Sequence, residues 1–203
     1  RGVDLLIGNK DGSCEGQQCK GRVRSNEYWT YGAVKEKGIW DKWKFQLESS
    51  KTHSVSLVSP LTFTLLEDLA QRARTTDIKK TRDFYDYQIN KSGADTVKLF
   101  HQYCGVMGLD PSKENELETA IDYLSRTYYR KFDDFELREI LIEKIGLLFI
   151  GDAEEIYAKF LKFIVMEDVW GKKIDALMIT NYCKENGIVF RNLARDTRIL
   201  TVI

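Results

Sequence analysis

The sequence lacks several patterns by which whole classes of protein are recognised. Its two histidines, His53 and His101, stand alone in their segments, and its four cysteines form no CxxC or Cys/His cluster. A zinc site and a Ser/His or Cys/His nucleophile therefore find no support. A glycine-rich phosphate loop of the GxxxxGK[ST] kind is also missing, so an NTPase site would have to lie outside this chain.

Long apolar runs and a secretory leader are missing as well. The apolar run at 147–150 is closed by Gly151 and Asp152, whereas a membrane span needs about 20 apolar residues. The chain opens on Arg1 and Gly2 with no signal-peptide pattern. Its cysteines lie far apart except for Cys14 and Cys19, and they fit reduced thiols. We therefore expect a soluble, cytoplasmic protein that does not enter a membrane.

The composition is that of a globular chain with an uneven distribution of charge. Its 203 residues are 43% hydrophobic and 31% charged, enough for one good core or two small ones. The net charge is zero, but residues 1–60 hold 10 Lys or Arg against 7 Asp or Glu, and residues 61–203 hold 21 against 24. The basic surplus thus lies in the N-terminal part, where it favours an anionic partner.

Residues 3–20 are predicted to form a β-hairpin, on which the candidate site depends. An apolar, β-prone run is followed by the turn sequence Asn-Lys-Asp-Gly at 9–12 and then by a second extended run. A three-residue loop with Gly12 in the left-handed region would set the pairing of the two strands. In that register Asp4 lies opposite Gln18.

Three polar side chains converge in this register, on what we expect to be a concave, solvent-accessible side of the sheet. Directly opposed residues lie roughly 5 Å apart at Cβ, so Asp4 and Gln18 would be neighbours, and Lys20 leans over the same face as a diagonal neighbour. An aspartate in an apolar strand is costly to bury without a cation or hydrogen bonds, and a metal ion would supply that cation. Glu15 points to the opposite face of a regular strand and ranks lower, unless a β-bulge at Gly16 turns it.

Asp4 followed by Gln18-Cys19-Lys20 resembles the D…(E/Q)xK signature of the PD-(D/E)xK, restriction-endonuclease-like nucleases, in the variant where glutamine replaces the acid. A longer set of sequence stretches resembles the Mrr-like effector nucleases of bacterial antiphage defence, including those fused to the N-terminus of STAND NTPases of the Avs type. The stretches that carry it are QQCKGR at 17–22, YWT at 28–30, WKFQL at 43–47 and SVSLVS at 54–59.

The resemblance implies a Mg²⁺- or Mn²⁺-dependent endonuclease that cuts double-stranded DNA when assembled. Asp4, the side-chain oxygen of Gln18 and the backbone carbonyl of Cys19 would ligate the metal, and Lys20 would orient the water or offset developing negative charge. The implied partners are double-stranded DNA, further copies of the full-length protein and a phage-protein trigger bound outside this chain.

A cationic and aromatic stretch follows the hairpin. Its arginines can bind phosphates and its aromatic rings can stack on bases. The candidate DNA-binding residues are therefore Arg22, Arg24, Tyr28 and Trp29. The alternative is a loop whose aromatic side chains pack under the sheet.

The order of predicted elements favours an α/β part followed by an all-helical part. After the hairpin comes a helix at 38–49, with Ile39, Trp40, Trp43 and Leu47 on one apolar face and charges opposite. A strand at 51–59 and a helix at 61–74 follow, and strand signals then nearly vanish. We predict a restriction-endonuclease-like mixed sheet with flanking helices at 1–75, a partial nuclease core whose first helix and strand are missing. A helical linker or assembly domain is predicted at 76–203, with helices at 113–132, 135–150, 153–166 and 173–186.

A second class of function stays open. Asp4 and Lys20 would merely form a salt bridge if the chain were a catalytically inactive nucleic-acid-binding or oligomerisation module of a larger multidomain protein. Metal binding separates the two hypotheses.

Overall fold

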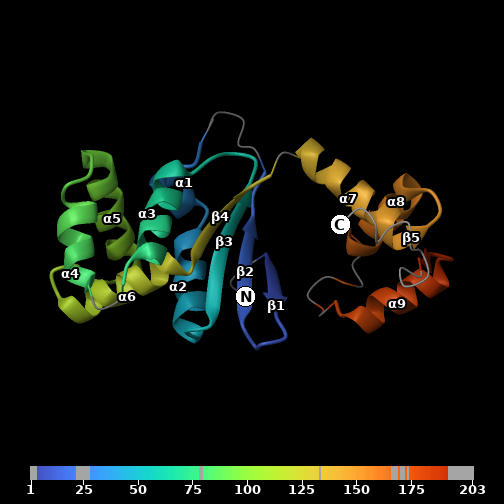
Figure 1. Cartoon of the computed structure of the whole chain (residues 1–203), viewed down its shortest axis with the longest axis horizontal. Helices are drawn as coiled ribbons and strands as arrows, with labels where there is room; N and C mark the ends of the chain where they lie inside the picture. Colours follow the sequence, from blue (N-terminus) through green and yellow to red (C-terminus); the bar gives the residue numbers. More distant parts are fainter. Residues whose placement is uncertain are drawn as a thin grey trace. The chain divides into compact units, whose positions relative to one another are not determined.

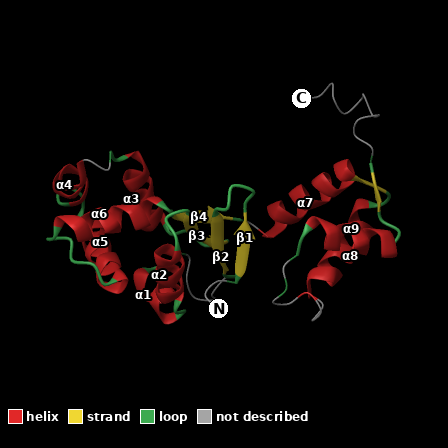
Figure 2. Cartoon of the chain, turned by 90° about the horizontal axis from the view of Figure 1, so that it is seen from below, coloured by secondary structure: helices red, strands yellow, loops and turns green. Residues whose placement is uncertain are grey.

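A computed structural model of the chain describes residues 4–21, 28–77, 80–132, 134–165, 169, 172 and 174–191. The chain forms two compact units, Arg1–Phe132 and Asp133–Ile203. Both contain helices and strands, as Figure 2 shows.

The first unit is built on a four-stranded mixed sheet with the strand order β1-β2-β3-β4. Strand β1 is antiparallel to β2, whereas β2, β3 and β4 are parallel to one another. The carboxyl ends of the three parallel strands therefore meet at one edge of the sheet, which we call the carboxyl edge. The strands are β1 (Leu5–Gly8), β2 (Cys14–Cys19), β3 (His53–Ser59) and β4 (Thr127–Lys131).

The hairpin of β1 and β2 has the predicted register. Leu5 pairs with Gln17 and Gly8 pairs with Cys14, as a three-residue loop requires. Gly12 has a φ of 82°, a left-handed conformation that glycine adopts without steric cost. The loop and the pairing that it sets are therefore confirmed.

The helices of the first unit lie on one side of the sheet, as Figures 1 and 2 show. Helix α2 packs against β3, and α3 packs against β4. The predicted mixed sheet with helices packed on it is thus present. The helical elements are α1 (Tyr31–Glu36), α2 (Ile39–Ser49), α3 (Thr64–Thr75), α4 (Thr81–Asp83), the π-helical η2 (Phe84–Ile89), α5 (Ala94–Met107) and α6 (Glu114–Ser125).

One hydrophobic core runs through the whole first unit. It joins residues of the sheet with residues of every helix from α1 to α6 except the short α4. The apolar face predicted for α2 is buried in it, with Trp40 and Trp43 among its largest fully buried side chains. Because the same core continues through α5 and α6 to Leu124, these helices belong to the unit that holds the sheet.

The structure therefore corrects the predicted boundary at residue 75, since the division falls after Phe132. Strand β4, which completes the sheet, lies in the stretch 113–132 that was expected to be one helix. The sequence Thr-Tyr-Tyr-Arg-Lys follows α6 without a glycine or proline to separate them. Its pairing with β3 is a contact between segments about 70 residues apart, which local periodicity does not reveal.

The second unit is mainly helical and has a small core of its own. Ile145, Phe149, Ile156, Cys183 and Ile188 form that core. Strands β5 and β6 pair antiparallel, so the expectation of an all-helical remainder is also corrected. Among the described helices, none is both long and apolar enough to span a membrane. The elements are α7 (Asp134–Leu148), β5 (Phe149–Ile150), α8 (Ala153–Val165), α9 (Ala176–Glu185) and β6 (Val189–Phe190).

Arg126 ties α2, β3 and α6 together in the first unit. Its guanidinium donates hydrogen bonds to the carbonyl oxygens of Leu47, Ser50 and His53 at 3.3, 2.9 and 2.6 Å. The first two carbonyls belong to the end of α2, where a helix leaves its last acceptors unpaired. Arg126 also pairs with Asp122 at 2.7 Å. This single side chain therefore fixes where α2 ends and β3 begins.

We predict that Arg126→Ala lowers the free energy of unfolding of the first unit by about 3 kcal/mol, because it leaves several acceptors and a carboxylate without their donor. Arg82→Ala is the control, since it removes an exposed pair with Asp86 and should cost less than about 0.5 kcal/mol. Urea titration of both variants measures the difference. Equal losses would contradict the role given to Arg126.

Candidate functional site

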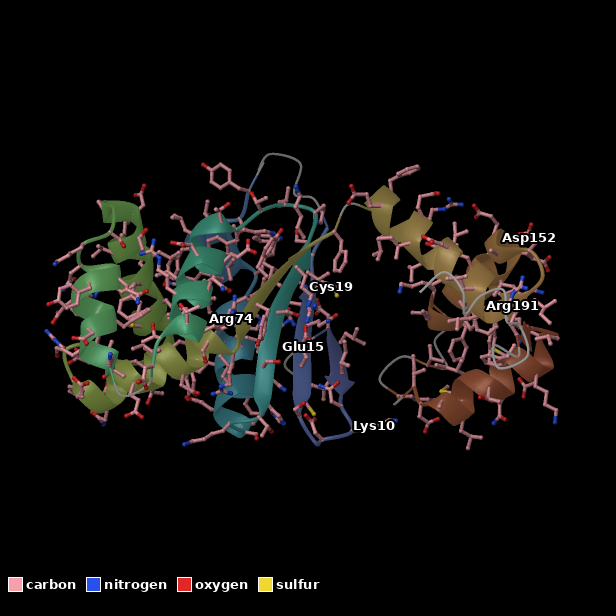
Figure 3. The ribbon with its side chains drawn as sticks, in the orientation of Figure 1. Lys10, Glu15, Cys19, Arg74, Asp152 and Arg191 are labelled. Atoms are coloured by element: carbon pink, nitrogen blue, oxygen red, sulfur yellow. The ribbon has the colours of Figure 1, made fainter. Side chains whose placement is uncertain are left out.

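Asp4 and Lys20 meet beside the carboxyl edge. The Lys20 ammonium lies 2.5 Å from Asp4 Oδ2, and the Cys19 N–H donates to the same oxygen at 3.1 Å. The Lys20 N–H donates to the Val58 carbonyl at 2.9 Å, so the β2–β3 pairing continues past the end of β2, where Figure 3 shows Cys19. The side chains of Asp4 and Lys20 are 36% and 24% exposed. The predicted acid and ammonium are therefore in contact and open to solvent.

The backbone turns the Asp4 carboxylate toward Cys19 and Lys20. The regular β1–β2 pairing begins at Leu5 and Gln17, and the Asp4 N–H donates to the carbonyl of this same Gln17 at 2.9 Å. Oδ2 of Asp4 then accepts both the Cys19 N–H and the Lys20 ammonium. Two donors on one oxygen hold the carboxylate in this orientation.

Gln18 differs from the expectation of an accessible side chain. It is fully buried, and its Oε1 accepts a hydrogen bond from Lys42 Nζ at 3.4 Å. Lys42 belongs to α2, so Gln18 lies on the face of β2 that the helices cover. Lys20 follows two residues later, beyond the end of β2, and keeps its ammonium partly exposed. The three predicted residues are thus brought to one region, but only Asp4 and Lys20 reach solvent.

Lys42 is a residue of this region that the sequence did not single out. Its helix was predicted to carry charges opposite an apolar face, but Lys42 was not named as a site residue. Its position in the sequence could have indicated this location, because Lys42 lies three residues after the buried Ile39, at the border of the apolar face. A long side chain at such a border can cover apolar surface and still place its charge at the edge.

Glu15 lies on the opposite face of β2, as predicted, and joins three strands there. Its carboxylate accepts two hydrogen bonds from Arg130 on β4, at 3.0 and 2.8 Å. It also accepts the Ser56 hydroxyl on β3 at 2.7 Å and the Gln17 amide at 3.1 Å. Glu15 is the second residue of β2 and is labelled in Figure 3. The bidentate partner was missed because β4 was not predicted as a strand.

Hydrogen bonds determine the ionisation of Glu15. Burial raises the pKa of its carboxyl, but the donors Arg130, Ser56 and Gln17 together outweigh burial and lower the pKa below the ordinary value of 4.5. Because the pKa is lower in the folded chain than in the unfolded one, the ionised carboxylate stabilises the fold above the ordinary value. That stabilisation is lost as pH falls through the folded-state pKa.

We predict that Glu15→Gln lowers the free energy of unfolding at about pH 7. The variant should also lose less of that free energy than the wild type as pH falls from about 5 to about 3, because it has no carboxylate to protonate at position 15. The control is Glu36→Gln, an exposed carboxylate of α1 with no hydrogen bond to any described residue. Urea titrations at several pH values measure both. A Glu15→Gln protein with the acid sensitivity of the wild type would contradict this account of the three-strand network.

The cationic and aromatic stretch is described in part. Arg22 and Arg24 lie outside the described residues. Trp29 is 2% exposed and donates its indole N–H to Ser59 Oγ at 2.9 Å, so it packs in the core and is not available to stack on a base. Tyr28 is 59% exposed. The alternative of aromatics packed beneath the surface therefore holds for Trp29 and not for Tyr28.

A pocket of about 690 Å³ lies beside Tyr28. It is lined by the buried residues Trp29, Phe63 and Leu99 and also by Lys98. Exposed Tyr28 thus lines a pocket that has buried apolar residues in its lining.

We predict that Trp29→Ala lowers the free energy of unfolding by about 3 kcal/mol, because it empties a large core site and leaves Ser59 Oγ without its indole donor. Tyr28→Ala should change it by less than about 0.5 kcal/mol, since the ring is mostly in solvent. Thermal and urea denaturation of the two variants give the comparison. Similar losses for both would show that Trp29 is not the packed member of the pair.

The residues around Asp4 fit a divalent cation in part. Asp4 Oδ1 accepts no hydrogen bond from the described residues, and together with the Cys19 carbonyl it offers the hard oxygen donors that Mg²⁺ prefers. Gln18 does not fit as placed, because its oxygen accepts from Lys42. Among the described residues, no group of three or more His, Cys, Asp or Glu side chains lies close enough to hold a metal. Any further ligands would have to be waters or phosphate oxygens, which Mg²⁺ commonly keeps.

Comparison with protein-family models, with curated proteins and with solved structures finds no match to this chain. The function therefore has to be inferred from the site itself.

Proposed function

We propose that this chain is a metal-dependent DNA endonuclease of the PD-(D/E)xK, restriction-endonuclease-like class, acting as an effector of antiviral defence in the bacterial cytoplasm. The observation that carries the proposal is the contact between Asp4 and Lys20, which are 16 residues apart and meet beside the carboxyl edge of a mixed sheet. An acid and a lysine in this arrangement are what the D…(E/Q)xK signature requires.

The location of the pair favours a functional role over a purely structural one. Ligands of open α/β sheets bind outside the carboxyl ends of the strands, and the pair lies at that end of β2. An exposed ion pair contributes about 0–1 kcal/mol to the stability of the fold. A contribution this small does not by itself account for the pair. The ion pair itself agrees with the inactive binding module too, and cleavage of DNA is what distinguishes the two.

The groups of the chain would act on a phosphodiester as follows. A divalent cation held by Asp4 and the Cys19 carbonyl would supply an activated water and neutralise charge on the phosphate. Lys20 would donate a hydrogen bond to a phosphate oxygen or to the attacking water, with its position set by Asp4 and by the backbone pairing to Val58. Exposed Tyr28 remains a candidate contact to DNA.

Exposed apolar side chains on the second unit support the assembly of several protein copies. Phe135, Val165 and Leu177 are 69%, 68% and 69% exposed, and further apolar side chains of α7 and α8 are exposed as well. Exposed apolar side chains of this size are ones that a protein partner can cover. On this proposal the second unit joins copies of the full-length protein, with its NTPase and its phage-protein trigger outside this chain, so that both DNA strands are cut only when nuclease sites gather.

We predict that Lys20→Ala abolishes plasmid cleavage by the full-length, triggered protein in Mg²⁺ or Mn²⁺, while the melting temperature stays within a few degrees of the wild type. Asp4→Ala should raise the metal concentration needed for cleavage, and EDTA should stop it in the wild type. Lys10→Ala is the matched control, because Lys10 lies in the turn of the same hairpin, at its far end in Figure 3.

Unchanged cleavage by Lys20→Ala would remove Lys20 from the site. Intact plasmid after treatment with triggered wild-type protein in several metals would instead favour the binding module.

A further inference from the structure

A second cation lies on the helix-covered side of the candidate site. Lys42 is in the first turns of α2 and is half-buried, and its ammonium contacts Gln18 Oε1 at 3.4 Å. That distance is long for a hydrogen bond from an ammonium group, for which about 2.8 Å is usual. The contact therefore restrains Lys42 only weakly.

Lys42 has no anionic partner among the described residues. No described carboxylate lies within salt-bridge distance of its ammonium, whose recorded contact is the neutral amide of Gln18. By contrast, Lys44 on the same helix pairs with Glu48 at 3.9 Å. A half-buried charge beside a single neutral acceptor is poorly compensated, and an anion from outside would compensate it better.

Helix α2 brings Lys42 to the same end of the sheet as Lys20. Lys42, near the start of the helix, contacts Gln18 near the end of β2, whereas Gln46, one turn on, contacts His53 at the start of β3. Because β2 and β3 are parallel, α2 runs antiparallel to both and its N-terminal end lies at the carboxyl edge. The partial positive charge of a helix N-terminus adds to the charge of Lys42.

Among the described residues of this region, one positive charge has no carboxylate partner. Asp4 and Lys20 neutralise each other, and Lys42 is left over. We propose that Lys42 binds a backbone phosphate of DNA, adjacent to the phosphate on which Lys20 acts. This inference rests on the proposed function for its ligand, and it makes Lys42 a binding residue that is independent of DNA sequence.

The test is the salt dependence of DNA binding by the full-length protein in EDTA, which prevents cleavage. Lys42→Gln should weaken binding of a labelled duplex and lower the slope of log K against log salt by about 1, as loss of one phosphate contact does. Lys42→Arg should keep most of the slope. Lys44→Gln, the matched control on the same helix, should leave the slope unchanged because Lys44 already has Glu48. In cleavage assays Lys42→Gln should raise KM more than it lowers kcat.

A merely structural Lys42 would behave differently. Lys42→Gln would then lower the melting temperature and leave the salt slope at the wild-type value, which overturns the inference. A wild-type protein that does not bind DNA also overturns it. A wild type that binds DNA but never cuts it, with a reduced slope in Lys42→Gln, would overturn the nuclease proposal and support the phosphate contact. Normal wild-type cleavage with an unchanged slope in Lys42→Gln would support the nuclease proposal and overturn the phosphate contact of Lys42.

Discussion

The register of the first hairpin is the constraint on which the candidate site depends. Successive side chains of a strand point to opposite faces, so a slip of one residue would move Asp4 away from Lys20 and exchange the surroundings of Glu15 and Gln18. A three-residue loop closed by left-handed Gly12 prevents that slip. A replacement at Gly12 would meet no neighbouring atom, but its side chain would be strained by the backbone conformation. Local backbone geometry thus determines the chemistry at the far end of the hairpin.

The two faces of β2 have different polar partners, and each face suits a different role. Glu15 is held by Arg130, Ser56 and Gln17, which satisfy both carboxylate oxygens and leave it little capacity to bind anything else. The residues near the other face, by contrast, include a carboxylate oxygen that accepts no bond from the described residues. They also include a lysine whose polar contact among those residues is a neutral amide. The first arrangement stabilises the sheet, whereas the second retains the capacity to bind a cation and a phosphate.

What the sequence predicted correctly is local, and what it missed is long-range. The hairpin, the apolar face of α2 and the contact of Asp4 with Lys20 follow from turn chemistry, periodicity and pairing within 20 residues. The addition of β4 to the sheet, and with it Arg130, depends on segments about 70 residues apart. The burial of Gln18 likewise depends on where α2 crosses β2, which no spacing within β2 encodes. The division at residue 75 failed for the same reason, because a shared core and not a change of pattern defines the first unit.

The partial exposure of the Asp4–Lys20 pair matters for the proposed chemistry. Separating an exposed ion pair costs about 0–1 kcal/mol, whereas breaking a buried one costs about 3–5 kcal/mol. At 36% and 24% exposure, the carboxylate and the ammonium can exchange each other for a cation and a phosphate without a large loss of stability. The pair then keeps both groups oriented and compensated when DNA is absent. Burial of the pair to the degree seen for Gln18 would make the two groups costly to separate and would close the site to its substrate.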